Sequence, residues 1–146
     1  MFNAATVPTV TPHLLARRAG AVLAGLVAIF LVTTATDVLL YLAGVLRPKG
    51  NPPMSNGLFL LAFTYRAIYG IAGSWLTARL APTRPMQHAL ALGAIGFALS
   101  IAGAIALWDA GPGWYSIGVA ASALPCAYLG GRLNTRRKWL ALRQRA

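Results

Sequence analysis

Acidic residues are nearly absent from this chain. Of its 146 residues, two are Asp or Glu, against 13 Lys or Arg, and the two acids are Asp37 and Asp109. Acid–base catalysis by paired carboxylates needs both groups in one site. Asp37 lies inside the first apolar run and Asp109 follows the third, at a different level, so the sequence argues against such an enzyme.

Cysteine and histidine are also scarce. The single cysteine, Cys126, has no partner for an internal disulfide, and His13 and His88 lack the neighbouring ligands that a metal requires. No nucleophile can be paired with a base, and no glycine-rich loop precedes a phosphate-binding lysine. We therefore expect no enzymatic activity, no metal and no cofactor.

Apolar residues, by contrast, make up 58% of the chain, and charged residues 10%. Soluble domains carry about one quarter charged residues, and each of four apolar runs here is long enough for a membrane span of roughly 20 residues. The sequence predicts an all-α integral membrane protein in which four transmembrane helices form an up-down bundle. The expected spans are 19–46, 58–80, 86–108 and 114–133.

Three regions follow from this pattern: a polar N-terminal segment (1–18), a four-helix transmembrane domain (19–133) and a basic tail (134–146). The first apolar run also fits a signal peptide with small residues at TTAT. It continues through VLLYLAGVL beyond any cleavage site, so an uncleaved first span is favoured.

Basic residues are distributed unevenly between the two ends of the predicted spans. Arg47 and Lys49 lie on one side, and ten lie on the other: Arg17, Arg18, Arg79, Arg84, Arg132, Arg136, Arg137, Lys138, Arg143 and Arg145. This bias predicts that both termini are cytoplasmic. It also explains the net charge without nucleic acid, and it makes anionic lipid headgroups the expected partner of the basic tail.

Aromatic residues gather at the opposite, outer ends of the spans. Trp108, Trp114 and Tyr115 bracket the connection between the third and fourth spans. Amphipathic rings of this kind are enriched at the level of the lipid headgroups. We therefore expect these three residues to anchor the helices at the membrane interface.

One acid and one base stand inside the apolar runs. Asp37 and Arg66 each lie about 12 to 14 Å from the outer end of their spans at 1.5 Å per residue. An unpaired charge inside a bilayer costs at least about 2.5 to 3.5 kcal/mol, so we expect the two to pair. Three roles stay open: fixing helix register, forming a proton, ion or anionic-solute site, or leaving Arg66 to reach the headgroups while Asp37 finds other partners.

Hydroxyl groups accompany this predicted pair. Thr33 and Tyr41 share a helix face with Asp37, and Tyr65 and Tyr69 lie near Arg66 on the second span. We expect these hydroxyls to satisfy the remaining hydrogen-bonding capacity of the charges. If the pair forms a solute site, the same residues line it.

Small residues predict where the helices pack closely. Gly70 and Gly73 lie on the Arg66 face of the second span, and a ridge on the fourth span repeats every four residues: Gly118, Ser122, Cys126 and Gly130. Residues without large side chains let transmembrane backbones approach. We expect these six positions to be packing positions, and Pro125 to bend the fourth helix.

Two segments carry a resemblance to other proteins. From YRAIYGIAGSWLTARLAPTRPMQHALALGAIG through LPCAYLGGRL, the chain resembles a group of short bacterial four-span membrane proteins. The resemblance implies a bacterial inner-membrane location and no particular activity. Small multidrug-resistance exporters also have four spans and an acid in the first, but theirs is a glutamate in a shorter chain.

From these observations the favoured function is a structural or accessory role in a membrane assembly, with self-association or binding to another membrane protein. The alternative is an oligomeric small-solute or ion permease or channel that uses Asp37 and Arg66. The two functions differ in whether the charge pair faces a pathway or is enclosed by helix packing.

Overall fold

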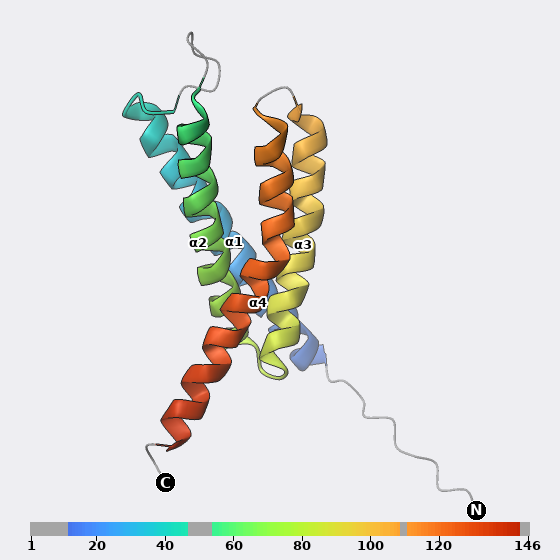
Figure 1. Ribbon diagram of the computed structural model, residues 1–146. Helices are drawn as coiled ribbons and strands as arrows, with labels where there is room; N and C mark the ends of the chain where they lie inside the picture. The colour runs from blue at the N-terminus through green and yellow to red at the C-terminus, as the bar shows by residue number, and fades with distance from the viewer. Residues whose placement is uncertain (1–11, 47–53, 109–110, 144–146) are drawn as a thin grey trace, which may run out of the picture.

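A computed structural model describes residues 12–46, 54–108 and 111–143 of the protein. These residues form four helices and no strand: α1 (Pro12–Leu42), α2 (Asn56–Leu80), α3 (Pro85–Ala106) and α4 (Gly113–Arg143). Successive helices run in opposite directions (Figure 1), as expected for an up-down bundle. The predictions for residues 1–11, 47–53 and 144–146 lie outside the described residues.

Three helices, α1, α2 and α3, are long and apolar enough to cross a membrane. The described residues of α4 do not reach the same apolar character, because basic and polar residues follow Gly131 in its second half. The expectation of four spans is thus supported by length and composition for three helices. For α4 it stays a prediction.

Helix α1 differs from the first expected span at both ends. Helix α1 begins at Pro12 rather than at 19, and it ends at Leu42 rather than at 46. Gly44 has a φ of 71°, a left-handed conformation that glycine adopts readily after a helix end. The apolar run continues past this glycine, so hydrophobicity alone placed the end too late.

Helix α4 also differs from its predicted span. It continues from Leu133 through the expected tail to Arg143. No glycine or proline follows Gly131, and Arg, Lys and Leu are good helix formers, so the helix does not stop where the apolar run stops. Pro125 lies inside α4, which changes direction along its length (Figure 1), as expected where a proline removes a backbone hydrogen bond.

The helices are most tightly packed near the connection between α2 and α3, which we call the connector end. Helix α4 packs along both α2 and α3, whereas α1 contacts α2 and, to a lesser extent, α3. Buried residues gather in this half of the bundle, including Gly25, Thr77, Ala89, Ala127 and Asn134. The amide of Asn134 donates to the carbonyl of Ala78 at 2.9 Å and joins α4 to α2. At the other end, the open end, the pair α1–α2 diverges from α3–α4 (Figure 1).

Glycines set the close helix contacts at the connector end. A Cβ at Gly25 would lie 1.8 Å from Oγ1 of Thr77 and 2.9 Å from the carbonyl oxygen of Gly73, so α1 and α2 touch at backbone distance. A Cβ at Gly130 would lie 2.5 Å from the carbonyl oxygen of Ile71 on α2. Because these neighbours include backbone atoms, neither position has room for a side chain.

We therefore expect Gly25→Ala to lower the free energy of unfolding by about 1 to 3 kcal/mol, the usual range for an overpacked contact. Gly20→Ala is the matched control, because no atom lies within 4 Å of its Cβ position on the same helix. The control should leave stability unchanged or raise it slightly, since alanine favours helix. Reversible denaturant unfolding in mild detergent measures both, and equal effects would contradict the close contact of α1 and α2.

Candidate functional site

Asp37 on α1 and Arg66 on α2 form an ion pair. Nη2 of Arg66 lies 2.6 Å from Oδ2 of Asp37. Both lie in the halves of their helices that face the open end, as their equal depth in the sequence predicts, and the guanidinium of Arg66 contacts Asp37 rather than extending away from it. The contact uses one guanidinium nitrogen and one carboxylate oxygen, so it does not occupy the whole planar fork of the arginine.

The second carboxylate oxygen has a partner on α2. Oδ1 of Asp37 accepts a hydrogen bond from the hydroxyl of Tyr65. Since Tyr65 precedes Arg66 in the chain, one turn of α2 supplies both groups that hold the carboxylate. Asp37 therefore has a partner on each oxygen, which lowers the cost of placing it among apolar side chains.

The other predicted hydroxyls are arranged differently from the expectation. The hydroxyl of Tyr69 lies 3.0 Å from that of Thr36, which itself donates to the carbonyl of Val32 at 2.9 Å. Tyr69 is thus the donor to Thr36, a residue that the sequence analysis missed. Oγ1 of Thr33 is buried and has no hydrogen-bond partner, and Tyr41 is 62% exposed on the outer part of α1. The expectation that Thr33 and Tyr41 would serve Asp37 was wrong in this detail.

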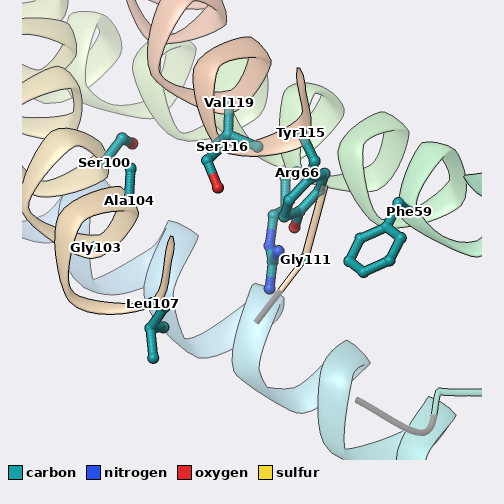
Figure 2. A pocket seen from close by; sticks show the side chains of 10 residues that line it. All are labelled: Phe59, Arg66, Ser100, Gly103, Ala104, Leu107, Gly111, Tyr115, Ser116 and Val119. Atoms are coloured by element: carbon teal, nitrogen blue, oxygen red, sulfur yellow. The ribbon is translucent and has the colours of Figure 1, made fainter. Parts of the chain in front are cut away.

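Aromatic rings flank the guanidinium of Arg66. Its central carbon lies 5.8 Å from the ring centroid of Tyr65 and 5.8 Å from that of Tyr115 on α4. The ring of Tyr115 also lies 5.3 Å from that of Phe59. Figure 2 shows Arg66 extending beside Tyr115, with Phe59 on the far side of that ring. Tyr115, expected only as an interface anchor, is therefore a neighbour of the charge pair.

Three cavities meet at Arg66. The α1–α2 cavity, of about 420 Å³, is bounded by Asp37, Tyr41, Tyr65 and Arg66 among others. The central cavity, of about 390 Å³, lies deeper between all four helices. The α3–α4 cavity, of about 230 Å³, lies between Arg66 and the open-end halves of α3 and α4. Arg66 lines all three, and Asp37 lines the first two.

The central cavity collects several of the residues predicted from sequence. Thr33, Asp37 and Arg66 line it together with Gly70, Ser122 and Cys126. Hydroxyls that the sequence analysis did not single out complete its polar surface, namely those of Thr34, Ser74 and Ser100. Among the predicted small residues, Ser122 and Cys126 thus border a cavity as well as a helix contact.

The remaining packing predictions separate into two groups. A Cβ at Gly73 would lie 2.2 Å from Cγ1 of Ile29 on α1, as tight as the contact of Gly130 with α2. A Cβ at Gly70 would lie 3.5 Å from Cβ of Cys126, and one at Gly118 would lie 3.4 Å from the ring of Phe63, which are ordinary contacts. Gly73 and Gly130 are therefore the close packing positions. Gly70 faces α4 rather than α1.

The described residues contain no group of three His, Cys, Asp or Glu side chains placed to hold a metal ion. Comparison of the chain with known protein families, curated proteins and solved structures finds no match. The chemistry available to the site is therefore argued from its own groups. These are a carboxylate, a guanidinium with unused donors, and hydroxyls around cavities that share Arg66 in their walls.

Proposed function

We propose that the protein is an integral protein of the bacterial inner membrane, with four spans and both termini cytoplasmic, that acts as a small-solute permease or channel. The solute would pass the Asp37–Arg66 pair. The observation that supports this proposal is the position of Arg66, which lines three cavities between the open end and the middle of the bundle.

The exposure of the pair favours a pathway over a role in helix register alone. The side chains of Arg66 and Asp37 are 32% and 34% exposed. Helix register is already determined at the connector end, where Gly25 and Gly73 bring the backbones of α1 and α2 together. A pair that served only register would be enclosed by neighbouring side chains, whereas this pair borders open space.

The polar surface of the cavities also supports passage of a solute. An ion or polar solute that leaves water needs groups that replace its hydration. The central cavity offers Thr34, Ser74, Ser100 and Ser122 in addition to the charged pair. The proposal includes no enzymatic step, because no nucleophile and base are placed together among the described residues.

Self-association or contact with another membrane protein is part of the proposal. Helix α1 buries only Ala21 and Gly25 within the chain, although it carries Asp37. A second protein beside α1 would complete the wall of the α1–α2 cavity, which one chain leaves open. The basic residues of the tail would meet anionic lipid headgroups.

The test is flux through liposomes that contain the purified protein. We expect the wild type to carry at least one of a panel of small carboxylates, halides, cations and protons faster than empty vesicles do. The double variant Asp37→Asn/Arg66→Gln should fold, because it leaves no unpaired charge, yet its flux should fall to that of empty vesicles. If the wild-type flux equals the flux of empty vesicles for every solute of the panel, the permease proposal is wrong and the accessory role remains.

A further inference from the structure

The α3–α4 cavity combines three features that attract negative charge. The first is the guanidinium of Arg66, which lines the cavity, whereas Asp37 does not. The second is the start of the 31-residue helix α4 at Gly113, because Gly111, Tyr115 and Ser116 line the cavity at that end. The N-terminus of a helix carries partial positive charge and free backbone N–H groups.

The third feature is a pair of hydroxyl groups. Ser100 on α3 and Ser116 on α4 line the same cavity, and in Figure 2 the hydroxyl of Ser116 lies toward Arg66, whereas Ser100 lies farther away beside Ala104. The hydroxyl of a serine can donate to an oxyanion. Residues with hydrogen-bond donors from α2, α3 and α4 thus line one cavity.

The remaining wall of the cavity is apolar. Phe59, Leu107 and Val119 line it together with the ring of Tyr115. Its volume is about 230 Å³. A strongly hydrated dianion is poorly matched to such a wall, whereas a single carboxylate with a short apolar body or one ring matches both the charge and the lining.

We propose that the α3–α4 cavity is a binding site for a small monocarboxylate, whose two oxygens are held by Arg66 and the hydroxyl of Ser116. Asp37 competes for the same guanidinium from the α1–α2 side, so that it acts as an internal substitute for the ligand when the site is empty. This assignment rests on the proposed function, because it names the substrate class of that pathway.

Benzoate is the probe, and benzamide is its neutral control of the same shape. Calorimetry on the protein in nanodiscs should give a Kd for benzoate at least about tenfold lower than for benzamide, a difference of about 1.4 kcal/mol. Benzylammonium should not bind. Asp37→Asn should tighten benzoate binding severalfold, because Arg66 is then free of its internal competitor. Arg66→Lys should weaken it, since an ammonium lacks the planar fork.

A cavity-filling pair of variants tests the location without changing a charge. Ala104 lines the α3–α4 cavity, whereas Ala106, on the same helix, is exposed and does not. Ala104→Phe should abolish benzoate binding, and Ala106→Phe should leave it unchanged. Both keep the Asp37–Arg66 pair, so both should retain the wild-type fold.

Three results would overturn the assignment: benzoate bound no better than benzamide, benzylammonium bound in preference to benzoate, or benzoate binding that survives Ala104→Phe. The proposed function fails separately. If benzoate binds in this cavity but neither benzoate nor any other panel solute crosses liposomes, the binding site stands and the permease does not. If flux occurs without benzoate binding, the pathway stands and the carboxylate assignment fails.

Discussion

Asp37→Asn and Arg66→Gln should each lower the free energy of unfolding by about 2 kcal/mol, because each leaves one charge without its partner inside the bundle. The estimate is below that for a fully buried pair, since about one third of each side chain is exposed. The double variant should lose less than the sum of the two single losses, with a coupling of at least about 1 kcal/mol. Denaturant unfolding in mild detergent provides all three values.

Arg79→Gln provides a matched control for this cycle. Arg79 is on the same helix as Arg66, but its guanidinium lies over the ring of Trp75, 5.3 Å from the centroid, at the connector end. The losses from Asp37→Asn and Arg79→Gln should therefore add. Additive losses for Asp37→Asn and Arg66→Gln as well would mean that the ion pair contributes nothing to the fold.

The charge pair could be predicted from the sequence because helix geometry fixes depth. A rise of 1.5 Å per residue places Asp37 and Arg66 at one level of adjacent antiparallel helices, and the cost of an unpaired charge in a bilayer supplies the reason to pair. The four helical segments could be predicted from the length of the four apolar runs. That length does not locate helix ends, because α1 ends near Gly44 and α4 continues to Arg143 for reasons of backbone conformation and helix propensity.

The surroundings of the pair were less predictable. Tyr65 rather than Tyr41 reaches Asp37, and Tyr69 pairs with Thr36. These contacts depend on the rotation of α1 against α2, which is determined by the contact of Gly25 with Thr77 and Gly73. The spacing within either helix does not specify that rotation. The contact of Tyr115 with Arg66 was missed because Tyr115 lies next to the connection between the third and fourth spans, where an aromatic residue suggests an interface anchor.

The cavities exist because the helices diverge at the open end. No local sequence pattern reveals this divergence. Buried residues of α3 stop at Gly93, and no residue in its second half is buried. An apolar residue facing a cavity and one facing lipid have the same signature in a sequence. The sequence offers one signal for the α3–α4 cavity, namely the hydroxyl residues Ser100 and Ser116, which lie on the two helices that line it.

Water in the α3–α4 cavity should produce a large difference in cysteine reactivity between neighbouring positions on α4. Ser116 lines the cavity, whereas Ile117 is 61% exposed on another face of the helix, where we propose that it meets lipid. A thiol reacts as the thiolate, which forms in water and not in hydrocarbon. In a Cys126→Ala background, Ser116→Cys should therefore react with a charged, membrane-impermeant reagent many times faster than Ile117→Cys.

The central claim is that water reaches the Asp37–Arg66 pair from the outer side. The most direct test is the same cysteine labelling in intact cells, with Ser100→Cys as a further single-cysteine variant. Ser100 lines both the central and the α3–α4 cavities. Thr83→Cys, in the connection between α2 and α3, is the reference for the side that we propose to be cytoplasmic. We predict that Ser116→Cys and Ser100→Cys are labelled from outside, while Ile117→Cys and Thr83→Cys stay protected. If Ser116→Cys and Ser100→Cys react as slowly as Ile117→Cys, the result contradicts a hydrated pathway. If Thr83→Cys is labelled from outside, the proposed orientation is reversed.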